Sequence, residues 1–160
     1  KNINEKLFYN FKVPLSRGDQ IKVRLKNKTV YLTDESYNSN PLSLKFAIEN
    51  FNNKNKSNKY LILGDMLELG KFSKILHKKM SKIINKTSIK KVYVVGKHIK
   101  ETFHSINIKK RGRILKDKSE IYQLIKNNLN NNDHLMIKAS NSTGLNDVVA
   151  NIKKGKIYAV

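Results

Sequence analysis

From Thr29 onward, short apolar runs alternate with segments whose apolar residues recur at helical spacing, and this alternation restricts the possible fold more than any other feature. The short runs are rich in β-branched residues and nearly continuous in apolar character, which is typical of strands buried on both faces of a parallel sheet. The predicted strands are residues 30–32, 60–63, 92–95 and 135–137, with a weaker one at 113–115.

The segments between these strands have apolar residues at positions i, i+3, i+4 and i+7, which predicts amphipathic helices. Repeated alternation of strand and helix requires crossovers, which are right-handed in nearly all proteins. The sequence therefore predicts an α/β fold with an open, mostly parallel, doubly wound (Rossmann-like) sheet and helices on both faces. The predicted helices cover residues 44–51, 72–84, 121–129 and 145–152.

The first 28 residues do not follow this pattern. Apolar residues between Ile3 and Phe11 indicate a helix, which is followed by a break at 14–18 and an alternating segment at 21–25. We predict that residues 1–28 are a connector or the tail of a preceding domain, and that residues 29–160 form the α/β domain. The chain starts without methionine in what resembles the middle of a helix, so we expect a fragment of a longer protein.

The chain of 160 residues has a formal net charge of +21, from 33 Lys and Arg against 12 Asp and Glu. Such a charge raises nucleic acid, anionic membranes and phosphorylated ligands as partners. However, the lysines are spread along the whole chain, and arginine, which grips phosphates and guanines bidentately, is scarce. A basic nucleic-acid-binding module is therefore the second hypothesis. The arginines are Arg17, Arg24, Arg111 and Arg113.

Several classes of protein are disfavoured by what the sequence lacks. It contains no cysteine, which excludes disulfides and cysteine-ligated metal sites. No apolar run approaches the roughly 20 residues that span a bilayer, and the N-terminus has no signal-peptide pattern. It contains neither G-x-x-x-x-G-K-[ST] nor H-E-x-x-H, the motifs of nucleotide hydrolysis and metalloprotease chemistry. We expect a soluble cytoplasmic protein that does not bind membranes.

Ligands of open α/β sheets bind outside the carboxyl ends of the strands, so the loops that follow the strands are the candidate site. These loops contain polar residues and glycine, but each has a structural explanation too. Gly64 and Gly96 would permit tight turns, Asp65 and Glu68 would favour a helix N-terminus, and residues 140–142 would cap the last helix. His77 would be a buried, hydrogen-bonded helix residue. The loops are residues 34–41, 64–70, 96–98 and 138–144.

Taken together, the loops contain motifs in a distinctive order. These are "DESYNSNPLSL" (34–44), "LGDMLELG" (63–70), His77, "VVGK" (94–97) and "IKASNSTGLNDVV" (137–149). They resemble the C-terminal domain of the Mur ligases, in the branch that joins D-alanyl-D-alanine to UDP-N-acetylmuramoyl-tripeptide. That branch typically has Asp-Asp-Ser-Tyr-Asn-Ala-Asn-Pro, then Gly-Asp-Met-x-Glu-Leu-Gly, then Lys-Gly-Ser-Arg. The resemblance covers residues 30 to about 150, and "NFKVPLSRGDQIKV" (10–23) resembles the family's exit from its central domain.

The resemblance implies a three-domain, ATP-dependent amide-bond ligase of peptidoglycan synthesis. Its C-terminal domain closes over ATP and positions the incoming dipeptide. ATP and Mg²⁺ are bound mainly by the central domain, which in this family carries the phosphate-binding loop, the metal ligands and a carbamylated lysine. We therefore expect this chain to be inactive alone, to have the N-terminal and central domains as partners, and to be monomeric. The expected substrates are UDP-N-acetylmuramoyl-tripeptide and D-alanyl-D-alanine.

In this family an acidic residue at the end of the first strand of the domain binds the ribose of the nucleotide. The matching residue is Glu35, where the family usually has aspartate, and Asp34 is the alternative because the longer side chain shifts the acceptor. By the same resemblance Tyr37 and Asn38 lie beside the nucleotide, and Arg17 lies near its phosphates.

The resemblance also assigns substrate-binding residues, namely Asp65, Lys138 and Ser140. In the last motif Ala139 replaces the family's glycine and Asn141 replaces its arginine. Arginine clamps a carboxylate bidentately and asparagine cannot. The resemblance therefore assigns the carboxylate of the dipeptide to Lys138 rather than to residue 141.

Overall fold

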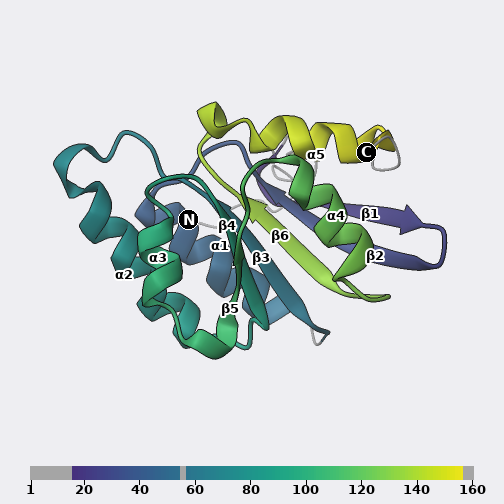
Figure 1. Cartoon of the computed structure of the whole chain (residues 1–160), viewed down its shortest axis with the longest axis horizontal. Helices are drawn as coiled ribbons and strands as arrows, with labels where there is room; N and C mark the ends of the chain where they lie inside the picture. The colour runs from purple at the N-terminus through teal and green to yellow at the C-terminus, as the bar shows by residue number, and fades with distance from the viewer. Residues whose placement is uncertain (1–15, 55–56, 157–160) are drawn as a thin grey trace, which may run out of the picture.

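The computed structural model describes residues 16–54 and 57–156, which form a six-stranded sheet with strand order β1-β2-β6-β3-β4-β5 (Figure 1). Five strands are parallel, and β1 is antiparallel to its neighbour β2. The mostly parallel, Rossmann-like fold predicted from the sequence is confirmed. The strands are β1 Asp19–Leu25, β2 Lys28–Glu35, β3 Lys59–Gly64, β4 Lys91–Val95, β5 Arg111–Ile114 and β6 His134–Lys138.

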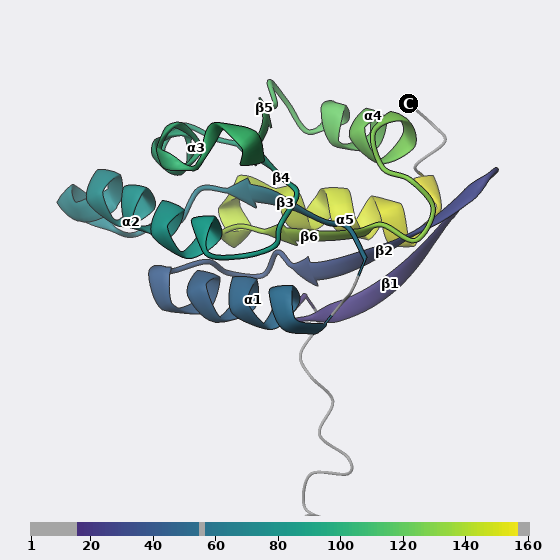
Figure 2. The same cartoon turned by 90° about the horizontal axis from the view of Figure 1, so that it is seen from below.

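Helices cover both faces of the sheet, and α1 and α5 lie on opposite sides of it (Figure 2). One apolar core lies between the sheet and α1, α2 and α3, and the other lies between the sheet, α4 and α5. The four predicted helices are present, and a fifth, α3, was not predicted because its six residues are too few to show a helical period. The helices are α1 Pro41–Lys54, α2 Ser73–Asn85, α3 Lys100–Ser105, α4 Ser119–Asn127 and α5 Leu145–Lys153.

The side chains of strand β2 lie alternately on the two faces of the sheet. Val30 and Leu32 belong to the core beneath α4 and α5. Thr33 and Glu35 line a cavity on the α1 side, together with residues of that helix. Because successive side chains of a strand alternate between faces, Asp34 lies on the α5 side and Glu35 on the α1 side.

The start of the described chain is part of the same sheet. Strand β1 pairs with β2 along its whole length, from Asp19 opposite Asp34 to Leu25 opposite Lys28. The predicted division of the chain at residue 28 falls at the turn of this hairpin and stays a prediction. The helix predicted near residues 3–11 lies outside the described residues.

Candidate functional site

The carboxyl ends of the parallel strands meet along one edge of the sheet. Glu35 at the end of β2 lies opposite Lys138 of β6, and Lys138 lies opposite Leu63 of β3. Gly64 of β3 in turn lies opposite Val95 of β4. The four loops that the sequence singled out therefore follow neighbouring strands at the same edge, as predicted.

A buried ion pair connects two of these strand ends. The side chain of Lys138 is 2% exposed and that of Glu35 is 24% exposed, and Lys138 Nζ lies 3.4 Å from Glu35 Oε2. Lys138 Nζ also donates a hydrogen bond of 2.9 Å to the carbonyl of Asn38. Burial lowers the pKa of Lys138, and the charge of Glu35 opposes this shift only in part. Lys138 thus holds both the Glu35 carboxylate and the loop that follows it.

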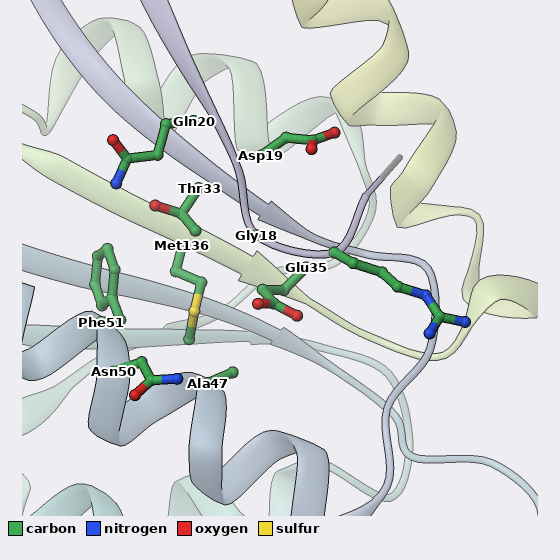
Figure 3. Close-up of a pocket in the computed structure, with 10 residues that line it drawn as sticks. Gly18, Asp19, Gln20, Thr33, Glu35, Ala47, Asn50, Phe51 and Met136 are labelled. Atoms are coloured by element: carbon green, nitrogen blue, oxygen red, sulfur yellow. The ribbon is translucent and has the colours of Figure 1, made fainter. Parts of the chain in front are cut away.

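Two cavities adjoin Glu35 on the α1 side of the sheet. The larger, of about 310 Å³, lies between α1 and the strands β1, β2 and β6 (Figure 3), where the Glu35 carboxylate extends toward Met136 and Ala47. The second, of about 210 Å³, also contacts Tyr37, Asn38 and Lys138. Arg17 and Glu35 line both. The two cavities therefore form a polar region around a carboxylate and a guanidinium group.

Arg17 and Tyr37 are in contact beside these cavities. The Arg17 guanidinium carbon lies 4.5 Å from the centre of the Tyr37 ring, a cation–π arrangement. The Tyr37 amide donates to the carbonyl of Ser16, which ties the two segments together. Tyr37 is 48% exposed, so part of its ring is open to solvent. The site thus offers a hydrogen-bond acceptor, a cation and an aromatic surface within one short stretch of the rim.

Asp34, the alternative to Glu35, is held on the other face. It is 1% exposed, accepts hydrogen bonds from the amide and hydroxyl of Ser36, and lies 3.0 Å from Lys153 Nζ of α5. Burial raises the pKa of Asp34, but the hydrogen bonds from Ser36 and Lys153 outweigh it and keep the pKa below its ordinary value. The structure does not bring Asp34 to the cavities that Glu35 lines.

The carboxylate of Asp65 is occupied by backbone amides. Its two oxygens accept hydrogen bonds from the amides of Lys97 at 3.0 Å and Ile99 at 2.7 Å. Gly96 has a φ of +134°, and a Cβ there would lie 2.6 Å from Asp65 Oδ1. The glycine therefore permits the close approach, and Asp65 fixes the loop between β4 and α3 onto the end of β3.

Ser140 and His77 hold the loop after β3 in the same way. The amide of Leu67 donates to Ser140 Oγ at 2.9 Å, and Ser140 Oγ donates to the carbonyl of Ser39 at 3.2 Å. His77 is fully buried: its Nε2 accepts from the amide of Met66 at 3.0 Å, and its Nδ1 lies 2.8 Å from the carbonyl of Ser73. The prediction of a buried, hydrogen-bonded histidine is confirmed.

Two negative findings apply to the described part of the chain. Residues 16–54 and 57–156 contain no group of three His, Asp or Glu side chains that could hold a metal ion. Among the helices that the structure describes, none is long and apolar enough to cross a membrane.

Known proteins are similar to this chain in both sequence and fold. The family model for the Mur ligase glutamate ligase domain matches residues 21–141. The chain is 30% identical over 139 residues to the UDP-N-acetylmuramoyl-tripeptide–D-alanyl-D-alanine ligase of Bacillus subtilis. This match covers 84% of this chain and 30% of that protein. It is 33% identical over 150 residues to the ligase of the same name from Buchnera aphidicola (Baizongia pistaciae), covering 89% of this chain and 32% of that protein.

A solved structure gives the same result for the fold. The MurF ligase from Thermotoga maritima, in complex with ADP, superposes with a TM-score of 0.75 at 22% identity, over 96% of this chain and 34% of that one. The chain spans about a third of the length of the curated relatives that it matches. The match of the family model over most of the described residues shows that this chain belongs to the Mur ligase family, in its glutamate ligase domain.

Proposed function

We propose that this chain is the C-terminal domain of the ATP-dependent ligase that adds D-alanyl-D-alanine to UDP-N-acetylmuramoyl-tripeptide in peptidoglycan synthesis. The observation that supports this most directly is the arrangement of Glu35, Lys138 and Gly64 at neighbouring strand ends, where four loops form one rim. The relatives with that ligase name match across most of the chain. In this proposal residues 1–28 lead from the central domain and residues 29–160 form the C-terminal domain.

The residues around Glu35 fit a nucleotide. The Glu35 carboxylate can accept hydrogen bonds from ribose hydroxyls, the exposed Tyr37 ring can pack against a base or sugar, and Arg17 can pair with phosphate. The two cavities that Glu35 lines, of about 310 and 210 Å³, together reach the usual size of small-molecule sites. We therefore assign Glu35, Tyr37, Asn38 and Arg17 to ATP binding. Asp34 serves the fold from the other face.

ATP supplies the phosphoryl group that activates the tripeptide carboxylate for attack by the amine of the dipeptide. The role of this domain is to orient the nucleotide and the dipeptide and to exclude water when it closes over the central domain. Lys138 keeps the Glu35 carboxylate in place through their ion pair. Hydrogen bonds of Ser140 and Asp65 fix the loops after β3, β4 and β6 relative to one another. We therefore propose that these two residues shape the dipeptide site through the loops.

The remaining features of the proposal concern the whole protein. Binding of Mg²⁺ and of the ATP phosphates is assigned to the central domain. The N-terminal and central domains are the partners of this one, and the enzyme is a cytoplasmic monomer. The nucleic-acid hypothesis depends on the net charge alone. It would need a tight, steeply salt-dependent complex with DNA or RNA at physiological ionic strength, whereas we expect weak binding that vanishes there.

The test uses the full-length enzyme with ATP, the UDP-linked tripeptide and D-alanyl-D-alanine. Wild type should form the UDP-linked pentapeptide, and Glu35→Ala should raise the Michaelis constant for ATP several-fold because it removes one or two hydrogen bonds to the ribose, each worth about 0.5–1.5 kcal/mol. Glu49→Ala is the control, since Glu49 lies in α1 and lines none of the cavities of the site. No pentapeptide from the wild type would refute the function.

The isolated domain gives a second test. Exposed hydrogen bonds from Glu35, Tyr37 and Asn38 cannot offset a cost of about 4 kcal/mol or more for the lost freedom of the ligand. Calorimetry on residues 1–160 should therefore detect little or no ATP binding and no ligase activity. Micromolar affinity would contradict the assignment of the phosphate grip to the central domain.

A further inference from the structure

Glu68, in the loop after β3, has a backbone conformation that side chains rarely adopt. Its φ is +63°, in the left-handed region that favours glycine and asparagine. Glu68 is exposed and is not needed to cover the core. A strained conformation at an exposed residue often marks a functional position.

The residues that precede Glu68 are held in place by contacts with distant parts of the chain. The amide of Met66 is held by His77, and the amide of Leu67 is held by Ser140. Asp65 is anchored to the next loop through its own side chain. Three consecutive residues are thus fixed before the chain reaches Glu68. Glu68 therefore follows directly after a segment that the tertiary structure holds in a fixed position.

No contact within the described fold explains why residue 68 carries a carboxylate. It makes no hydrogen bond or ion pair with the described residues, and the short 3₁₀ turn Gly70–Phe72 that follows has no side-chain cap. In contrast, the carboxylates of Asp34 and Glu35 pair with lysines. Without such a partner, the Glu68 carboxylate is available to a ligand.

Glu68 lines a third cavity of about 270 Å³ at the rim. It carries a charge, and the other described residues that line this cavity are neutral. The neighbouring cavity shares Tyr37 and Asn38 but is lined by two cations, Arg17 and Lys138, and by the carboxylate of Glu35 that pairs with Lys138. The rim thus has a compartment of mixed charge around Glu35 and, beside it, an acidic compartment whose one charged lining residue among those described is Glu68. The neutral residues of the acidic one are Tyr37, Asn38, Leu67, Ser140, Asn141 and Ser142.

The acidic compartment suits a small organic cation with several N–H donors. A primary ammonium group has three donors and no acceptor, so it requires oxygen atoms around it. The Glu68 carboxylate provides charged oxygens, and the hydroxyl of Ser142 provides a neutral one. The amide oxygen of Asn141 already accepts a hydrogen bond from Asn146 at 2.7 Å and can accept a second. A hydrogen bond to a charged partner contributes more than one between neutral groups.

We propose that Glu68 binds the ammonium group of the incoming amine substrate and makes the enzyme specific for a free amine. This inference rests on the proposed ligase function, in which that substrate is D-alanyl-D-alanine. The loop that Asp65, His77 and Ser140 fix holds Glu68 at the rim, beside the compartment of Glu35. The dipeptide amine is thereby oriented on the same edge as the nucleotide.

The experiment uses the full-length ligase with the variants Glu68→Gln and Glu68→Gly. Glu68→Gln should raise the Michaelis constant for D-alanyl-D-alanine about tenfold or more, the effect of losing one charge-assisted hydrogen bond, and leave that for ATP unchanged. Glu49→Gln is the matched control, because it removes the same charge from α1 and should change neither constant. An unchanged dipeptide constant in Glu68→Gln would overturn the inference.

Two further measurements separate binding of the amine from a structural role. Glu68→Gly should not lower the melting temperature, because glycine relieves the positive φ, yet it should raise the dipeptide constant as Glu68→Gln does. Inhibition by an analogue of the dipeptide with hydroxyl in place of the amine should be equal in wild type and Glu68→Gln. Equal weakening of the analogue and the dipeptide would contradict the inference. Absence of ligase activity in the wild type would instead refute the proposed function.

Discussion

Asp34 and Glu35 are consecutive residues whose carboxylates pair with different lysines on opposite faces of the sheet. Asp34 Oδ2 lies 3.0 Å from Lys153 Nζ of α5, and Glu35 Oε2 lies 3.4 Å from Lys138 Nζ of β6. Asp34 is buried beneath the last helix, whereas Glu35 is partly exposed at the edge where the loops meet. The acidic pair therefore combines one residue that stabilises the fold with one that is available to a ligand.

Replacement of Lys138 by methionine tests how the ion pair serves Glu35. Methionine has a similar length and no charge, so it removes the cost of burying the ammonium group but leaves Glu35 and the carbonyl of Asn38 without their partner. We expect the free energy of unfolding to fall by about 1–3 kcal/mol. In the full-length ligase the Michaelis constant for ATP should rise several-fold, because Glu35 and the loop at Asn38 lose their common partner. A rise in the dipeptide constant with no change for ATP would show that Lys138 binds the dipeptide carboxylate instead.

The variant Asp34→Asn should lower the free energy of unfolding by about 2 kcal/mol, since it removes the charge that Lys153 and Ser36 bind in a buried site. Asp19→Asn is the control: Asp19 also contacts Lys153, at 3.4 Å, but is more exposed, so its loss should cost less than about 1 kcal/mol. Urea unfolding measures both. Equal effects of the two variants would contradict the distinct role of Asp34.

The same carboxylate makes stability depend on acid pH. Its pKa in the folded state is lowered, so its contribution is complete above the unfolded value of about 4 and is lost as the pH falls through the folded value. The pH profile of Asp34→Asn should lack this loss.

His77 should make stability depend on pH nearer to neutrality. Burial lowers its pKa, so between the unfolded value of about 6.5 and the lower folded value the unfolded chain binds a proton that the folded one does not. Stability should therefore fall as the pH drops below about 6.5, by at most about 1.4 kcal/mol per pH unit for this residue. Urea unfolding at pH 5–8 measures the slope.

His134 also has a pKa lowered by burial, so a control is needed to separate the two histidines. His77→Gln should reduce the slope and leave the part that His134 contributes, and His134→Gln should do the reverse. A slope that His77→Gln leaves unchanged would show that burial does not keep His77 neutral in the folded protein.

Gly64→Ala should destabilise the domain by about 1–3 kcal/mol through overpacking. A Cβ at residue 64 would lie 2.6 Å from the Cβ of Ala139 and 3.0 Å from Leu145 Cδ1. Ala139→Gly in the same chain removes the closer of these contacts and should restore much of the loss. Thermal unfolding of the single and double variants measures it. A double variant no more stable than Gly64→Ala would contradict this explanation of the glycine.

The type and approximate position of most elements, and the edge at which the loops gather, could be predicted from the amino-acid pattern alone. The spacing of apolar residues in a segment such as 121–129 depends only on the local helical period, so it can be recognised without the rest of the chain. The shared edge follows because parallel strands end on the same side. Helix α3 was not predicted, because the segment Lys100–Ser105 is too short to show a helical period.

The contacts that define the site were decided by the tertiary structure. The alternation of side chains along a strand would have been enough to predict that Asp34 and Glu35 lie on opposite faces of the sheet. It could not identify their partners, because Lys153 lies 119 residues after Asp34 and Lys138 lies 103 residues after Glu35. Nor could spacing show that the Asp65 carboxylate is occupied by the amides of the loop after β4. These pairings arise from the order of strands in the sheet, which depends on how helices pack against both faces rather than on any local period.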